Sequence, residues 1–144
     1  MKCHTYILKD HEEEVLIYAH ERNKIVEDIE NIVNTSSIEI LGIYNEEKVI
    51  INPIDITCFI SESNKVYALI KDKKYQIKYR LYQLEELNIN NSFIKINQSC
   101  YANIKMIKKF ESTFSGALKV IFNNGYVDYI SRRELKNVKE RMGL

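Results

Sequence analysis

The sequence predicts a mostly β protein with short helices, preceded by a small mixed α+β segment. Beyond residue 45, short runs rich in β-branched and aromatic residues alternate with polar turns, which is typical of strands. Before residue 45, one stretch has the apolar spacing of an amphipathic helix. Charge divides the chain as well: residues 1–62 hold five Lys or Arg and thirteen Asp or Glu, a net −8, and residues 63–144 hold sixteen and seven, a net +9. The basic half is a candidate for binding a polyanion, unless the charge is simply scattered unevenly.

The composition argues against several classes of protein. A chain of 144 residues with 45% hydrophobic content can bury a core of its own. No apolar run approaches the roughly 18 residues that a membrane span needs. The start MKCHTYILKDHEEE lacks the basic residues and apolar centre of a signal peptide, so we expect a cytoplasmic protein. The three cysteines form no CxxC pair, which argues against a disulfide framework or a zinc module.

Residues 1–44 are expected to form a small acidic appendage. Strand-like stretches at residues 5–8 and 15–19 precede a helix predicted over residues 21–34, and IEILGIY follows it. The apolar residues on one face of this helix are Ile25, Val26, Ile29, Ile32 and Val33. Because the segment is too small for a core of its own, we expect the apolar face to pack on the rest of the protein and the carboxylates to stay exposed.

Residues 45–144 are expected to form a β domain. Strands are predicted at KVIIN, ITCFI, KVYALI and YQIKY, with KDKK as a polar turn between the last two. RLYQLEELNI has a helical period and predicts a short helix on the sheet. A second β section follows with FIKIN, MIKKFEST, ALKVIF and YVDYI. Its hairpin turns are predicted at Ser115 and Gly116 and at Asn124 and Gly125, since Gly and Asn tolerate a positive φ.

The chain ends in YISRRELKNVKERMGL, which predicts a strand running into a helix. Ser131 and Glu134 have the spacing of a capping box. Between them, Arg132 and Arg133 fall in the first helical turn, where the helix dipole favours acidic residues. A helix N-terminus flanked by two guanidinium groups suits an anion such as phosphate. The alternative is a solvated pair balanced by Glu134 and Glu140.

A set of residues in fixed order and spacing identifies a family resemblance: Phe93, Ile94, Lys95, Ile96, Ser99, Asn103, Ser115, Gly116, Asn124, Gly125, Ile130, Ser131, Arg132 and Arg133. The stretch that contains them resembles the C-terminal half of a LytTR DNA-binding domain, and the resemblance extends back to about residue 45. It implies an elongated arrangement of β-sheets that reads double-stranded DNA with loops and strand ends. It therefore implies a sequence-specific transcription regulator. The residues themselves indicate no enzyme, cofactor or metal site.

The resemblance also implies partners. Family members often carry a phospho-acceptor receiver domain, but 44 residues cannot form a doubly wound domain, so the chain resembles the stand-alone type. In relatives of this type the resemblance implies control by a membrane-protein inhibitor, for which the acidic N-terminal helix would be a docking surface. Two protomers are expected to bind repeated half-sites as a homodimer.

Three groups of residues are candidates for contacting DNA. Arg132 and Arg133 are expected to face the duplex, because a guanidinium bonds a guanine edge or a phosphate with two hydrogen bonds. In the NQS triplet, Asn97 and Gln98 can pair with adenine and Ser99 can bond phosphate, although a plain polar turn is the alternative. The family more commonly has His-Arg-Ser at this triplet, so its preferred base pairs do not carry over.

The third group is the loop SESNK, whose candidates are Asn64 and Lys65, with Ser63 as a further one. Asn64 could equally serve only as a turn former. Contacts that neutralise the DNA backbone are expected from Lys78, Arg80 and Lys95, each of which could instead be ordinary surface.

Other chemistry has weaker support in the sequence. His4, His11 and His20 are spaced by seven and nine residues, which matches no structural zinc pattern. Cys100 follows Ser99 without a histidine in the β domain to act as a base, so no nucleophilic enzyme is indicated; a redox role or a buried thiol remains open for Cys100. The ten tyrosines allow an alternative function as a module that binds single-stranded RNA or DNA, or as a protein-interaction module, although packing within strands explains them more simply.

Overall fold

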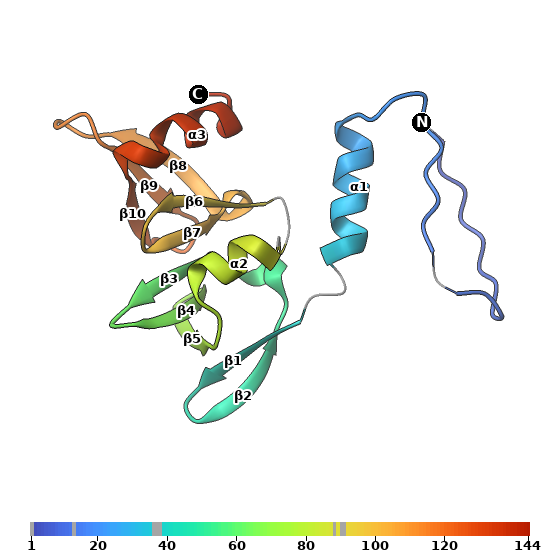
Figure 1. Ribbon diagram of the computed structural model, residues 1–144, viewed down its shortest axis with the longest axis horizontal. Helices are drawn as coiled ribbons and strands as arrows, with labels where there is room; N and C mark the ends of the chain where they lie inside the picture. The colour runs from blue at the N-terminus through green and yellow to red at the C-terminus, as the bar shows by residue number, and fades with distance from the viewer. Residues whose placement is uncertain (1, 13, 36–38, 88, 90–91) are drawn as a thin grey trace.

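The computed structural model describes residues 2–12, 14–35, 39–87, 89 and 92–144. The described residues form a body of two antiparallel sheets and two α-helices. A further helix, α1 (Lys24–Thr35), stands to one side of this body (Figure 1). The predicted class, mostly β with short helices, is confirmed. None of the helices in the described ranges is long and apolar enough to cross a membrane.

The larger sheet has seven strands in the order β2-β1-β5-β4-β3-β7-β6. Every neighbouring pair in it is antiparallel. The strands are β1 Ile40–Tyr44, β2 Glu47–Ile51, β3 Cys58–Glu62, β4 Lys65–Ile70, β5 Lys73–Ile77, β6 Phe93–Asn97 and β7 Cys100–Asn103.

The smaller sheet has three strands in the order β10-β9-β8. They are β8 Ile107–Ser112, β9 Leu118–Phe122 and β10 Val127–Ile130. The turns between them hold Gly116 with φ 83° and Gly125 with φ 87°, as the hairpin prediction requires. The helices are α1 Lys24–Thr35, α2 Leu81–Leu87 and α3 Arg132–Met142, and α3 ends at the left-handed Gly143.

The larger sheet separates two hydrophobic cores. One face packs on α2, whose Leu84 is fully buried with Phe59 and Ile56. The other face packs on the smaller sheet and α3, where Phe122 and Val138 are fully buried. Successive residues of a strand point to opposite faces, so β3 sends Phe59 into the first core and its two neighbours into the second. Each such side chain contributes roughly 1.5–3 kcal/mol by leaving water.

The N-terminal part differs from expectation in three ways. Residues 5–8 and 15–19 form no strands, because β-propensity needs a partner strand to be realised. The segment IEILGIY provides β1, which pairs with β5, so the boundary expected after residue 44 falls inside the sheet. The apolar face of α1 does not cover the β domain: neither core includes a residue before Ile40.

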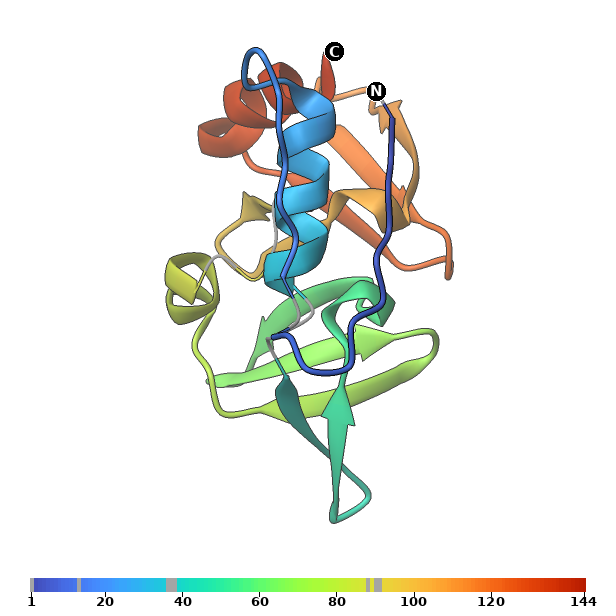
Figure 2. The same cartoon turned by 90° about the vertical axis from the view of Figure 1, so that its right-hand side faces the viewer.

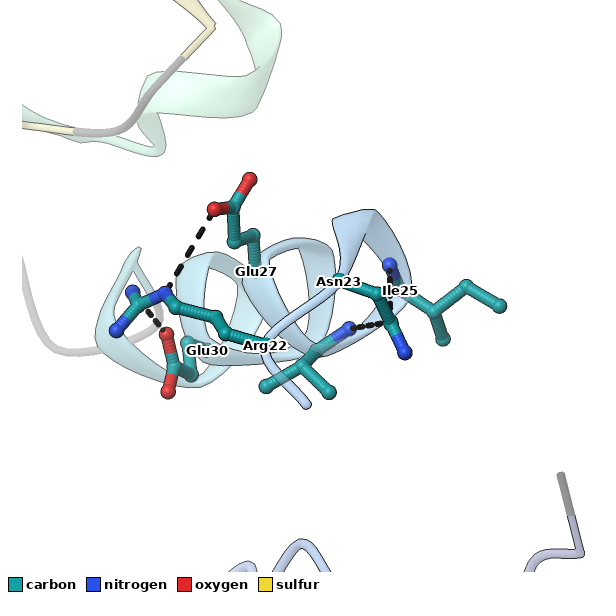
Figure 3. Close-up of polar contacts among 6 residues, drawn as sticks. Arg22, Asn23, Ile25, Glu27 and Glu30 are labelled. Atoms are coloured by element: carbon teal, nitrogen blue, oxygen red, sulfur yellow. Dashed lines mark hydrogen bonds and ion pairs between the residues drawn. The ribbon is translucent and has the colours of Figure 1, made fainter. Parts of the chain in front are cut away.

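The start of α1 is set by Asn23. Its Oδ1 accepts hydrogen bonds from the backbone N–H of Ile25 (3.1 Å) and of Val26 (3.2 Å), which caps the helix (Figure 3). The helix therefore begins at Lys24, three residues later than the start at residue 21 that was predicted from its apolar spacing.

Candidate nucleic-acid interface

Three connections that are far apart in the sequence meet at one edge of the fold. They are the β3–β4 turn, the β6–β7 turn and the β10–α3 junction (Figure 1). The backbone N–H of Ser61 donates to the carbonyl of Ser99 (2.9 Å), which joins the first two. The N–H of Ser131 donates to the carbonyl of Ile96 (2.9 Å), which joins the third to the end of β6. These bonds make one continuous edge, called the turn edge below.

The β3–β4 turn is a tight hairpin turn with exposed side chains. Ser63 and Asn64 have φ of 50° and 63°, and Glu62 pairs with Lys65, which is the geometry of a two-residue type I′ hairpin. Asn64 is thus a turn former, and its side chain is nevertheless exposed, as are those of Ser63 and Lys65. The carbonyl of Asn64 accepts a hydrogen bond from Arg80 Nη1 (2.9 Å), so a candidate phosphate contact also holds the turn in place.

The β6–β7 turn occupies the side chain of Asn97 with hydrogen bonds inside the protein. Its Nδ2 donates to Asp128 Oδ1 (2.9 Å) and to the carbonyl of Tyr129 (2.8 Å), and its Oδ1 accepts from the N–H of Ser99 (2.8 Å). Both amide hydrogens are therefore occupied, and Asn97 cannot form a bidentate pair with adenine without breaking these bonds. The side chains of Gln98 and Ser99 are exposed and are the parts of the triplet available to a ligand.

The β10–α3 junction exposes both arginines of the first helical turn. Among the described residues, neither Arg132 nor Arg133 forms an ion pair or a side-chain hydrogen bond, and both side chains are exposed, which fits a contact with DNA and equally fits the alternative of a solvated pair. Ser131 occupies the N-cap position without a side-chain cap bond, so the predicted capping box does not form. The N-terminal N–H groups of α3 therefore lack a side-chain cap and can meet an anion together with the two guanidinium groups.

Two shallow depressions bring the remaining cationic candidates together. One, of about 210 Å³, is lined on this side by Asn64, Lys65, Lys78 and Arg80. The other, of about 340 Å³, includes Arg80, Lys95 and Gln98. Arg80 lines both and connects the β3–β4 turn to the β6–β7 turn. Lys95 lies 3.9 Å from Glu85, so part of its charge is compensated within the chain.

A polar cluster that the sequence did not reveal lies beneath the turn edge. Asp128 accepts hydrogen bonds from Asn97 and from the hydroxyl of Tyr126 (3.3 Å). Burial, followed by the nearby Asp128 carboxylate, raises the pKa of Tyr126, so this phenol stays protonated. Asp128 and Asn97 are 31 residues apart, and only the packing of β10 beside β6 brings them together.

The cysteines fall into two environments. Cys3 is exposed, whereas Cys58 and Cys100 are fully buried on the paired strands β3 and β7. A hydrogen bond with Cys58, together with burial, raises the pKa of Cys100 well above its ordinary value. Cys100 is therefore a buried, protonated thiol, which is poorly reactive. Within the described residues, no group of three His, Cys, Asp or Glu could hold a metal ion.

The fold is that of a β-type domain whose turn edge gathers two turns and a helix N-terminus. The chain belongs to the LytTR family: the sequence model of the LytTr DNA-binding domain matches residues 46–143. A solved LytTr DNA-binding domain from Bacillus cereus superposes with a TM-score of 0.69, covering 74% of this chain and 97% of that chain at 17% identity. This second likeness concerns the fold alone.

Similar proteins are also found along the whole chain. The "Uncharacterized HTH-type transcriptional regulator SAS2254" of Staphylococcus aureus (strain MSSA476) is 32% identical over 147 residues, covering 100% of this chain and 99% of that protein. SAOUHSC_02645 of strain NCTC 8325 / PS 47 carries the same description and is 31% identical with the same coverage. In the present chain α2 and α3 are separated by five strands, so these two helices do not form a helix-turn-helix.

Proposed function

We propose that this protein is a transcription regulator that binds specific sequences of double-stranded DNA in the cytoplasm through its turn edge. One observation carries the proposal: three connections that are far apart in the sequence meet at the turn edge, and one of them exposes Arg132 and Arg133. The chain that has this edge belongs to a non-enzymatic DNA-binding family. A planar guanidinium matches the edge of guanine, and free helix N–H groups match phosphate. The single edge offers both kinds of contact.

The proposed roles follow from which polar groups are free. Arg133 reads a base edge and Arg132 holds phosphate beside the helix N-terminus, or the two exchange these roles. Gln98 takes the base-reading role expected of the triplet, since the amide of Asn97 is occupied. The residues proposed to contact phosphate are Ser63, Lys65, Lys78, Arg80, Lys95 and Ser99, with Asn64 at the tip of the β3–β4 turn.

The proposed partners are a second copy on repeated half-sites and an inhibitor. Single protomers of this size cover few base pairs, so two half-sites on one duplex raise the specificity. A basic partner, such as the membrane-protein inhibitor that the family resemblance implies, fits the acidic residues before β1 by charge.

Selection from a random duplex library, followed by anisotropy titrations, tests the proposal. We expect an enriched motif, and tighter binding to it than to random duplex or to either separated strand. Tighter binding to single strands would reject the duplex function and support the single-strand module. Tyr101 is buried and Tyr44 packs on Tyr75 at a centroid distance of 5.2 Å, so these rings are not stacking platforms. Tyr79, Tyr82 and Tyr129 are exposed and are the rings that the single-strand alternative would use, so the comparison of duplex with single strands decides between the two.

A further inference from the structure

Residues 2–35, called the N-terminal arm below, expose an unusual amount of apolar surface. Their exposed fractions lie between 54% and 91% for Tyr6, Ile7, Leu8, Val15, Leu16, Tyr18, Ile25 and Ile32. Isolated exposed apolar side chains are ordinary, but eight within one short segment are not. Such a surface indicates an interaction site.

The apolar face of the arm's helix is only partly covered: Val26 is 7% exposed and Ile29 is half-buried, but the apolar residues toward both ends are open. Figure 3 shows its polar side, where Arg22 pairs with Glu30 (2.7 Å) and Glu27 (3.6 Å). On the apolar side Ile25 is 54% and Ile32 is 67% exposed. A helix of 12 residues is marginal in water unless its apolar face packs on something. We therefore expect the apolar side of the arm to pack on a partner surface.

The area of the arm fits a protein interface of standard size. The eight apolar side chains together expose on the order of 1,000 Å², and a stable interface buries about 800 Å² per partner. A second copy of the chain carries the same apolar surface, and a two-fold axis would place the arm of one protomer against the arm of the other. Ile25, Ile29 and Ile32 recur at spacings of four and three residues, which is the stripe that packs against an equal stripe on another helix.

Charge argues against two other occupants. Residues 1–35 hold four Lys or Arg and eight Asp or Glu, a net −4. An acidic segment is repelled by DNA and by anionic lipid surfaces, to which amphipathic helices bind when they are basic. Two acidic arms also repel each other, but salt screens charges on an exposed surface, so we expect the apolar contact to outweigh this repulsion and the dimer to tighten as salt is added. The relatives also match this chain over its whole length, arm included. The arm is thus a shared part of these proteins and is unsuited to nucleic acid or membrane.

The position of the arm leaves the turn edge free. In Figure 1 α1 lies on one side of the molecule, and the β3–β4 and β6–β7 turns lie on the other. Figure 2, viewed from the side of the arm, shows α1 and the segment before it in front of both sheets. Two chains joined through their arms would therefore keep both turn edges open.

We propose that the N-terminal arm is the homodimer interface, in which α1 and residues 5–8 and 15–19 of one protomer pack against the same elements of a second copy. This assigns a surface to the homodimer of the proposed function, yet it requires no DNA. The segments that have strand propensity but form no strands in the single chain gain their missing partners in the dimer.

Sedimentation velocity of the full chain without DNA tests this interface. We expect the wild-type protein and the control Ile54→Asp, whose side chain is 58% exposed outside the arm, to have the mass of a dimer. Ile32→Asp and Tyr18→Asp should halve that mass while circular dichroism stays that of a folded β protein. A monomeric wild type at tens of micromolar, or arm variants that remain dimeric, would overturn the proposal. Wild-type protein that floats with anionic vesicles would also overturn it.

Cys3 provides a second and independent measurement. It is the exposed cysteine and lies in the arm, whereas Cys58 and Cys100 are buried. A short bis-maleimide should therefore cross-link wild-type chains through Cys3 and lose most of that yield with Ile32→Asp; equal yields for both would contradict the arm interface. The DNA function is judged separately, because monomeric Ile32→Asp should still bind a single half-site. If it dimerises as proposed but no form binds duplex DNA, only the proposed function fails.

Discussion

Replacing Asn97 with alanine should damage both stability and DNA binding, because the side-chain amide of Asn97 holds the β6–β7 turn against β10. The change removes three hydrogen bonds, one of them to the Asp128 carboxylate. At about 0.5–1.5 kcal/mol for each bond, with the charged one at the upper end, the free energy of unfolding should fall by about 2–4 kcal/mol. The midpoint of urea unfolding should then fall on the order of 1–2 M at an unchanged slope.

The matched control is Gln98→Ala at the next position. Because Gln98 is exposed, the unfolding free energy of the Gln98→Ala variant should stay within about 0.5 kcal/mol of the wild-type value, while its affinity for the selected DNA site should fall. Asn97→Asp should be worse than Asn97→Ala at neutral pH, because it sets a second carboxylate against Asp128. Protonation of one of the two carboxyl groups removes this repulsion, so the penalty should shrink in acid. If Asn97→Ala had the stability and DNA affinity of the wild-type protein, the proposed role of Asn97 in holding the β6–β7 turn in place would be refuted.

The other predictions concern charge, the arm and the thiols. Arg133→Ala should cost about 1–3 kcal/mol on the selected site and little on random duplex, whereas Arg132→Ala should weaken both, or the two should show these effects exchanged; unchanged affinities for both would remove them from the interface. If about six phosphates are neutralised per protomer, gel shifts across a salt series should give a slope near −5 in log affinity against log salt, and a slope near zero would contradict an electrostatic interface. Removing residues 1–38 should spare binding to one half-site and abolish cooperativity on two, as titrations of both duplexes would show. Iodoacetamide at neutral pH should label Cys3 quickly and Cys100 only after unfolding. Because the pKa of Cys100 is raised in the folded state, stability should decline as the pH rises above about 9, which urea titrations at several pH values would measure.

Local chemistry explains which elements could be predicted from sequence. Gly116 and Gly125 adopt positive φ within hairpins, so a two-residue signal was sufficient to place those turns. The period of Leu81, Leu84 and Leu87 likewise predicted α2 correctly. In both cases the residues that determine the structure lie next to one another in the chain.

Elements that depend on distant partners could not be predicted in the same way. Residues 15–19 have the composition of a strand, but pairing is a property of two segments, and among the residues that the structure describes none pairs with them as a strand. The role of Asn97 depends on its hydrogen bond to Asp128 of β10, which is 31 residues further along the chain. From the polar triplet alone, a side chain that holds the turn in place could not be distinguished from one that contacts a base. Arg132 and Arg133 are exposed, which is a local consequence of charge in a first helical turn, and their contact with DNA stays a prediction.

The alternating β3 strand has a consequence for how the regulator loses its structure. Since Phe59 belongs to one core and Cys58 and Ile60 to the other, neither core can melt while the other keeps this strand in place. The domain should therefore unfold in a single cooperative transition, and the amides of β3 should be among the last to exchange with solvent. Because the β3–β4 turn is part of the same unit, heat should abolish DNA recognition over a narrow temperature interval and not by gradual fraying.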